Sequence, residues 1–539
     1  MKMQSPWYMN AVLYQVYIRA FFDSNSDGHG DIPGLTQKLD YLEELGVDCL
    51  WLMPFYPSPL RDDGYDVADY CGIHPDYGTL DDFRVLLASA HRRGIRIITD
   101  LVLNHTSDQH PWFQAARRDP NSPYRDYYVW SDRPDRYGQV RIIFLDTENS
   151  NWTWDESAGR YYWHRFYSSQ PDLNYDNPAV RAEILKIIAF WLDLGVDGFR
   201  VDAVPYLFER EGTDCENLPE THAYLKEIRR FIDANYPGRI LLCEANQWPD
   251  EVRKYMGDGD EIQMAFHFPI MPRIFLALAR QERAPLEWAL NNTPPVPEDC
   301  QWCVFLRNHD ELTLEMVTPQ ERDQLWDTYA ADPRMRLNLG IRRRLAPLLT
   351  NDRRRIQLAN SLLFTLPGSP IIYYGDEIGM GDNIWLADRH GLRTPMQWNP
   401  GPNAGFSGAP AGRLYAPVIE TGPFAPSAVN IVQARADQGS LWQVIREMIR
   451  VRKQQPALAR GDFSWVACDS PAIVAYTRAT PTAQVLVIHN LSAGEINTRI
   501  PCPGALTDLF GGERVLPGKG AISLKLAPYG YRWLTVERG

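Results

Sequence analysis

The chain has 539 residues, and 55 Lys and Arg against 68 Asp and Glu give a formal net charge of −13 at neutral pH. A hydrophobic fraction of 45% with 23% charged residues is ordinary for globular proteins and excludes disordered, collagen-like and coiled-coil classes. The negative net charge argues against nucleic-acid binding, and the chain has no stretch rich in Lys and Arg with aromatic residues between them.

The first ten residues contain one lysine and no long apolar run, so they do not have the pattern of a secretory signal. No window of about 18 consecutive apolar residues predicts a membrane-spanning helix. We therefore expect a cytoplasmic protein that does not associate with membranes. The eight cysteines are too sparse for a disulfide framework, and the lone CxxC of Cys300 and Cys303 favours small buried residues over a zinc or redox site.

Short apolar runs alternate with helical patterns of period 3.6 along most of the chain. The predicted strands are 12–18, 49–53, 95–103, 198–203, 240–243, 264–268, 304–306 and 370–374. The predicted helices are 35–45, 81–93, 178–194, 221–235, 353–366 and 438–453, and glycines follow three of them as helix C-caps. Eight such βα units predict an α/β fold, a (β/α)8 TIM barrel, over an open doubly wound sheet.

Two segments depart from this alternation. Residues 104–177, after the third strand, are rich in Trp, Tyr, Asp, Asn, Ser and Pro and contain no long helical pattern, which predicts an inserted subdomain. Beyond residue 458, alternating runs such as 472–476 and 485–489 predict an antiparallel, sandwich-like β-domain. We therefore expect a catalytic barrel over 1–104 and 178–457, an inserted subdomain B over 105–177 and a C-terminal domain over 458–539.

Polar residues end several predicted barrel strands, which is where the active sites of such barrels lie. The third strand leads into Asp100, Asn104 and His105, and the seventh into Arg307-Asn308-His309-Asp310. The fourth reads Gly198-Phe-Arg-Val-Asp202, so that period-2 alternation places Arg200 and Asp202 on one face, and the fifth ends in Glu244.

The carboxylates Asp202, Glu244 and Asp310 are therefore expected on one rim. A single carboxylate there could simply cap a loop, but three with two histidines and an arginine fit glycosidic chemistry. In that chemistry one carboxylate attacks the anomeric carbon while another donates a proton to the leaving oxygen. We expect Arg200 to keep Asp202 ionised by lowering its pKa, whereas Glu244 must begin protonated.

These residues resemble, in order and spacing, the four signature regions of the α-amylase family, glycoside hydrolase family 13. The matching segments are Asp100-Leu-Val-Leu-Asn-His105, Gly198-Phe-Arg-Val-Asp202, Glu244-Ala-Asn246 and Asn308-His-Asp310. The resemblance covers almost the whole chain. Residues 170–174 resemble an additional signature of the oligo-1,6-glucosidase subfamily. Residues 55–65, 209–219 and 393–398 resemble the family members that isomerise maltose to trehalose.

The resemblance implies roles for individual residues. Asp202 is the nucleophile, Glu244 the general acid/base and Asp310 the stabiliser of the transition state. The implied substrate-binding residues are Asp62, Tyr65, His105, Phe166, Gln170, Arg200, His309 and Arg393. Among these, Tyr65 would form a stacking floor and Asp62 and Arg393 would pair at the blind end of the pocket, while a plain packing role stays open for Phe166. Arg141, in the insert, and Asn246 are candidate gate contacts.

The implied activity is the isomerisation of maltose (α-1,4) to trehalose (α,α-1,1) by intramolecular transglucosylation. It would proceed by a retaining double displacement through a β-glucosyl-enzyme, with minor hydrolysis to glucose and no cofactor in the chemistry. An α-glucosidase or another transglycosylase of the family fits the same motifs. A non-catalytic barrel, as in transporter heavy chains, is disfavoured because the catalytic set is present and no membrane segment is predicted.

The implied partner is a small disaccharide substrate. A functional link to a maltokinase also follows from the resemblance, although no kinase domain is expected within these 539 residues. Whether the chain forms a homo-oligomer stays open.

Structural calcium is the last expectation. After the first strand, oxygen ligands occur at every second residue, as they do at the start of a calcium-binding loop. These residues are Asp23, Asn25, Asp27, His29, through its carbonyl oxygen, and Asp31. Gly34 stands where an EF-hand has its bidentate glutamate, which excludes an EF-hand. The resemblance implies a second calcium that ties the insert to the barrel, with ligands Asn104, Asp172, Glu209 and the carbonyls of Tyr206 and Leu207.

Overall fold

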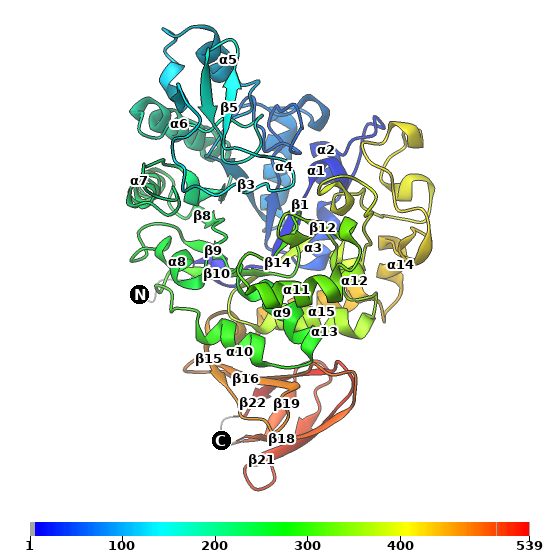
Figure 1. Cartoon of the computed structure of the whole chain (residues 1–539). Coiled ribbons are helices and arrows are strands. Elements are labelled where there is room, and N and C mark those ends of the chain that lie inside the picture. Colours follow the sequence, from blue (N-terminus) through cyan, green and yellow to red (C-terminus); the bar gives the residue numbers. More distant parts are fainter. Residues whose placement is uncertain (1–5, 503, 538–539) are drawn as a thin grey trace.

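Eight short, buried apolar runs form a closed parallel barrel at the centre of the molecule (Figure 1). The structure is a computed structural model and describes residues 6–502 and 504–537. The barrel strands are β1 (Leu13–Val16), β2 (Cys49–Leu52), β3 (Arg96–Val102), β7 (Gly198–Asp202), β8 (Ile240–Cys243), β9 (Met264–Phe266), β10 (Gln301–Phe305) and β14 (Ser369–Tyr373). Each pairs in parallel with the next barrel strand along the chain, and β14 closes the ring on β1. The predicted TIM barrel is confirmed.

The principal helices are α2 (Ile32–Gln37), α3 (Leu39–Leu45), α4 (Leu80–Arg92), α6 (Pro178–Leu194), α7 (Pro219–Asn235), α9 (Ile270–Arg280), α10 (Ala284–Asn291), α11 (Pro319–Tyr329), α13 (Arg353–Thr365) and α15 (Leu441–Gln454). A capping box of Thr79 and Asp82 begins α4, and Gly195, in the left-handed region, ends α6. The single helix expected over 35–45 is wrong, because the Lys38 N–H bonds back to carbonyls of α2 and ends that helix. Within the described residues, no helix has the length and apolar character that a membrane span requires.

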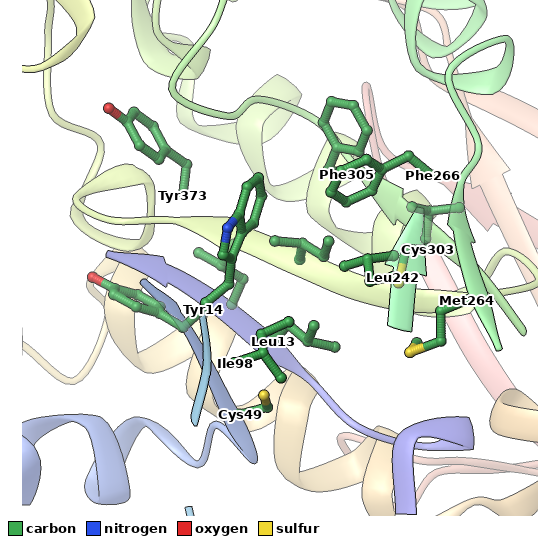
Figure 2. Close-up of a cluster of buried hydrophobic side chains, with 14 of the residues drawn as sticks. Leu13, Tyr14, Cys49, Ile98, Leu242, Met264, Phe266, Cys303, Phe305 and Tyr373 are labelled. Carbon is green, nitrogen blue, oxygen red and sulfur yellow. The ribbon is translucent and has the colours of Figure 1, made fainter. Parts of the chain in front are cut away.

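Apolar side chains from different strands gather in one buried cluster (Figure 2), among them Leu13, Ile98, Leu242 and Phe266. Gly198 begins β7 where a Cβ would lie 2.3 Å from the carbonyl oxygen of Ile240, so this strand approaches β8 too closely for any larger residue. Cys300 and Cys303, at the start of β10, are buried and free. Polar side chains lie at the carboxyl ends of the strands, outside this apolar core; Asp202 ends β7, for example, and Glu244 follows β8.

The insert lies between β3 and α6 and stands at one end of the molecule in Figure 1. It contains α5 (Pro111–Arg118) and a three-stranded antiparallel sheet of β4 (Trp130–Ser131), β6 (Arg160–Trp163) and β5 (Trp152–Asp155), in that order. A β-bridge joins His105 to Asp172, so the start and the end of the insert lie side by side next to the barrel.

The C-terminal part is antiparallel β-structure at the opposite end of the molecule (Figure 1). Its strands are β15 (Asp462–Trp465), β16 (Ile473–Ala479), β17 (Gln484–Asn490), β18 (Ile496–Pro501), β19 (Leu506–Asp508), β20 (Arg514–Val515), β21 (Ala521–Leu526) and β22 (Tyr531–Val536). A six-stranded sheet and the β18–β21 pair enclose a second apolar cluster that includes Ile488, Ile500 and Leu534. The predicted C-terminal antiparallel β-domain is confirmed.

Candidate active site

The loops after the barrel strands enclose one pocket of about 140 Å³. Eight residues predicted from the sequence line it: Asp62, Tyr65, His105, Phe166, Asp202, Glu244, Asn246 and Asp310. Four others, Gln170, Arg200, His309 and Arg393, each contact a lining residue from behind. The fold thus brings the predicted catalytic and binding residues together, although they come from segments more than 300 positions apart.

Arg200 is the centre of the carboxylate cluster. It lies in β7 with its side chain fully buried, and its Nη1 is 2.5 Å from Oδ1 of Asp202. The same guanidinium also contacts Asp100 and Glu244. Directly after Asp202 the backbone turns through Ala203 at φ 50, a left-handed conformation that costs energy in a residue with a Cβ. This turn ends the strand where its last carboxylate meets the pocket.

The two carboxyls expected to react have pKa values on the high side of their ordinary range. Burial raises the pKa of Asp202 to about 6, although the neighbouring Arg200 lowers it. Burial also raises the pKa of Glu244 to about 8, with the charges of Asp202 and Asp310 adding to the effect. Arg200 lowers the pKa of Asp202, as expected, but desolvation outweighs the arginine, so the pKa lies above its usual value. Glu244 still holds its proton more tightly than Asp202 does.

Asp310 is the most strongly ionised carboxylate in the pocket. Burial raises its pKa, but His309, Arg389 and Arg393 lower it by more than burial raises it. The pKa of Asp310 therefore lies well below its ordinary range. Arg389 Nε lies 2.9 Å from Oδ1 of Asp310 and 2.8 Å from Oε2 of Glu311. Sequence reasoning missed Arg389. Its position four residues before Arg393, in the loop after the eighth strand, is the signal that could have found it.

The predicted pairing of Asp62 with Arg393 is wrong. Arg393 contacts Asp63 instead, with Nη2 3.1 Å from Asp310 and Nε donating to the carbonyl oxygen of His309. Asp62 lines the pocket and accepts a hydrogen bond of 2.8 Å from Gln170 Nε2. Because the arginine lies on the adjacent aspartate, burial raises the pKa of Asp62 well above its usual value.

Tyr65 and the two histidines form a rigid wall. The ring of Tyr65 stacks on that of His309 at 5.3 Å between centroids, and its hydroxyl lies 2.8 Å from Nε2 of that histidine. His105 Nε2 donates to the carbonyl oxygen of Tyr65 at 3.2 Å. Burial lowers the pKa of His105 to about 3 and that of His309 to about 4, so both imidazoles are neutral near pH 7. Phe166 continues the wall, packing against His105 and Phe144.

Arg141 reaches from the insert to two residues of the pocket lining. Its Nη1 lies 2.8 Å from Oε2 of Glu315, and its Nη2 lies 3.3 Å from the hydroxyl of Tyr206. Both partners line the pocket. Asn246 donates a 3.1 Å hydrogen bond to Thr313 on the same side, while its buried Oδ1 has no hydrogen-bond partner. Of the two candidate gate residues, Asn246 lines the pocket and Arg141 contacts its lining, and their role as a gate stays a prediction.

The second predicted calcium set has the features of a cation site. Three buried oxygens there have no hydrogen-bond partner, namely Oδ1 of Asn104, Oδ2 of Asp172 and Oε1 of Glu209. Burial raises the pKa of Asp172 to about 8 and that of Glu209 well above its usual value. Oxygens of this kind are the ligands that Ca²⁺ takes, and a buried polar atom without a partner is costly. These residues fit a calcium ion, with Tyr206 and Leu207 just before Glu209 in the chain.

The first predicted calcium loop differs, because its oxygens already have partners. Asp23, Asn25 and Asp27 each accept hydrogen bonds from backbone N–H groups two or three residues ahead. Asp31 caps α2 through the Gly34 N–H, and the His29 ring faces Asp27 and Asp76. Among the residues that the structure describes, no group of three or more His, Cys, Asp or Glu side chains is placed to hold a metal ion. Calcium in this loop stays a prediction.

Comparisons with known proteins agree with this geometry. Residues 15–330 and 341–461 match the family described as alpha amylase, catalytic domain, and residues 463–533 match the maltogenic amylase C-terminal domain. The chain is 59% identical over 499 residues to "Trehalose synthase/amylase TreS" of Mycolicibacterium smegmatis, covering 90% of this chain and 84% of that protein. It is 53% identical to "Trehalose synthase" of Pimelobacter sp., covering 98% of this chain and 95% of that protein.

Among solved structures, the trehalulose synthase MutB from Pseudomonas mesoacidophila MX-45 superposes with a TM-score of 0.79 at 28% identity. The match covers 99% of this chain and 100% of that one. The similarity therefore extends over the barrel, the insert and the C-terminal sheet together.

Proposed function

The chain belongs to the α-amylase family of enzymes, and from this premise we propose that it is an isomerase that converts maltose to trehalose. The observation that carries the proposal is the pocket itself, which gathers Asp202, Glu244 and Asp310 and whose lining residues Glu315 and Tyr206 contact Arg141 of the insert. Such contacts between the insert and the pocket lining suit a reaction in which the first product must stay for the second step. The names of the two relatives at 59% and 53% identity support the choice of substrate.

In the proposed first step, a carboxylate oxygen of Asp202 attacks the anomeric carbon of the non-reducing glucose of maltose. Glu244 donates its proton to the glycosidic oxygen, which leaves as the hydroxyl of free glucose. The result is a β-glucosyl ester on Asp202. The state required at the start, Asp202 ionised and Glu244 protonated, agrees with the order of their pKa values.

In the second step, the retained glucose presents its anomeric hydroxyl to the ester. Glu244, now ionised, takes the hydroxyl proton while the oxygen attacks the anomeric carbon and the ester bond to Asp202 breaks. Two inversions leave the transferred glucose in the α configuration, and attack by the α anomer of the retained glucose gives α,α-trehalose. Water attacking in place of glucose would give two glucose molecules as a minor product.

The remaining side chains bind and orient the sugar in this proposal. Asp310, held ionised by Arg389 and Arg393, would accept hydrogen bonds from hydroxyls of the reacting ring. Neutral His105 and His309 would contact the same ring, and Asp62, oriented by Gln170, would bind its far end. Tyr65 would face the apolar side of the pyranose.

We also propose one structural calcium, held by Asn104, Asp172 and Glu209 with carbonyls of Tyr206 and Leu207. Bound there, the ion would neutralise two buried carboxylates and fix the insert on the barrel. Placement of the chain in the oligo-1,6-glucosidase subfamily remains part of the proposal, supported by residues 170–174.

Incubation with maltose, followed by chromatographic separation of the products, tests the function. We expect trehalose as the main product and expect Asp202→Ala to reduce its formation by roughly 10³-fold or more, because the nucleophile is lost. Asp81→Ala, at an exposed position that pairs with Arg84, should match the unsubstituted enzyme. Glucose without trehalose would contradict the isomerase and favour the α-glucosidase alternative.

A further inference from the structure

Glu216 lies behind the gate arginine without lining the pocket. It belongs to the segment between β7 and α7, and its side chain is 8% exposed. Its Oε1 accepts hydrogen bonds of 2.8 Å from Arg141 Nε and of 2.8 Å from Arg165 Nη2. Its Oε2 accepts a third, of 2.9 Å, from Gln247 Nε2.

The charge of Glu216 suits this position. Burial raises its pKa, but the hydrogen bonds and charge of Arg141 and the charge of Arg165 lower it by more than burial raises it. The pKa of Glu216 therefore lies below its ordinary value. An ionised, buried carboxylate shared by two arginines is a strong and directional anchor. Removing its charge leaves the buried Arg165, whose Nε and Nη1 already lack partners, without its carboxylate.

Each partner of Glu216 contacts a residue that lines the pocket or is adjacent to one in the chain. Arg141 continues to Glu315 and Tyr206, which line the pocket. Gln247 is adjacent in the chain to Asn246, and Arg165 is adjacent to Phe166, and both neighbours also line it. One carboxylate therefore fixes two segments of the insert and the loop after β8 relative to one another.

We propose that Glu216 is a positioning residue that holds Arg141 on the pocket-lining Glu315 and Tyr206 and thereby sets how the glucosyl-enzyme divides between transfer to glucose and hydrolysis. This inference rests on the proposed function. In transfer, the anomeric oxygen of the retained glucose bonds to the anomeric carbon of the ester. In hydrolysis, the oxygen of water does so. In both reactions the proton passes to Glu244 and the bond to Asp202 breaks, so the two differ only in which acceptor occupies the closed pocket.

The variant Glu216→Gln tests the proposal through the ratio of glucose to trehalose formed from maltose. This ratio divides one intermediate between two acceptors, so it does not depend on how much of the enzyme is folded. We expect it to rise roughly three- to ten-fold, because an unanchored Arg141 lets glucose leave and water enter. An unchanged ratio would overturn the proposal.

Glu211→Gln is the matched control. Glu211 lies in the same segment and also contacts an arginine of the insert, with Oε1 3.0 Å from Arg136 Nε, but that pair is exposed and neither residue lines the pocket. We expect its ratio to equal that of the unsubstituted enzyme. A shift as large as that of Glu216→Gln would mean that any link to the insert matters, and would overturn a specific role for Glu216.

A double variant shows whether Glu216 acts through Arg141. We expect Arg141→Gln to raise the ratio by itself and the double variant to raise it no further, because both changes open the same contact. Additive effects would overturn the assigned route. If the unsubstituted enzyme forms no trehalose at all, the proposed function fails first, and that outcome is distinct from a variant with an unchanged ratio.

Discussion

At the scale of single residues, two carboxyls of similar chemistry acquire different tasks from their surroundings. Both contact Arg200 and both are largely shielded from water, yet the pKa of Glu244, about 8, lies above that of Asp202, about 6. The charge of Asp310 raises both pKa values, whereas the hydrogen bond between the two carboxyls lowers the pKa of Asp202 and raises that of Glu244. At neutral pH the pair holds one proton, which is what a nucleophile and an acid need.

Because the two carboxyls must hold one proton between them, we predict a bell-shaped dependence of kcat/KM for maltose on pH. As pH falls through about 6, Asp202 takes up a proton and the nucleophile is lost. As pH rises through about 8, Glu244 loses the proton that the leaving oxygen needs. Initial rates across this range, with the thermal midpoint measured in the same buffers, separate titration from unfolding. A profile that stays flat well above pH 8 would contradict the role of Glu244.

At the scale of elements, buried polar contacts help to hold the insert on the barrel. The bridge between His105 and Asp172 joins its two ends, and the Glu216 cluster joins its interior to the loops after β7 and β8. Between them lie the partnerless oxygens of Asn104, Asp172 and Glu209. Each such atom costs about 1–3 kcal/mol when left without a partner. A cation bound there would give these oxygens a partner and would strengthen the attachment of the insert to the barrel.

Calcium is therefore expected to raise the melting temperature of chelator-treated protein by a few degrees, because it binds only the folded chain. Asp172→Asn should abolish most of that shift, since it removes a ligand charge. Asp27→Asn, in the loop after β1 whose oxygens are already engaged, should retain it. Differential scanning calorimetry with and without Ca²⁺ makes the comparison. Loss of the shift in the Asp27 variant alone would place the ion in the first loop.

At the scale of the whole molecule, α13 joins the barrel to the C-terminal sheet through buried polar contacts. Ser361 accepts a 2.8 Å hydrogen bond from Trp533 Nε1 and lies 2.8 Å from Nε2 of His489. Arg478 Nη1 donates to the carbonyl oxygen of Thr365 at 2.9 Å. Because these groups are buried, separating the two parts would leave them without partners. The sheet is therefore fixed to the last barrel units, at the end of the molecule opposite the insert (Figure 1).

Ser361→Val should lower the free energy of unfolding by about 2–4 kcal/mol, because it leaves the Trp533 N–H and the His489 ring without a partner. The values of kcat and KM below the melting transition should not change, since Ser361, His489 and Trp533 do not line the pocket. Ser523→Val makes the same change at an exposed position of β21 and should stay within about 0.5 kcal/mol. Equal stability of the two variants in denaturant titrations would contradict the role of this interface.

The order of elements and most of the site were predictable from the amino-acid sequence. Strand and helix patterns are local, and a parallel barrel brings every strand end to one rim, so Asp202, Glu244 and Asp310 were expected to converge. The resemblance to the α-amylase family then supplied roles for residues with no local signal, such as Tyr65 and Gln170.

Three features were decided only by the tertiary structure. Adjacent aspartates at 62 and 63 look alike in sequence, and only the packing shows that Arg393 lies on Asp63. The sign of the pKa shift of Asp202 depends on how burial balances Arg200, and a linear sequence does not state how deeply a group is buried. Glu216 is one acidic residue in an irregular loop. Its importance comes from two arginines and a glutamine that the fold brings to it from distant parts of the chain. Residue type and spacing specify what a side chain can do, whereas its partners and its exposure to water follow from contacts between remote segments.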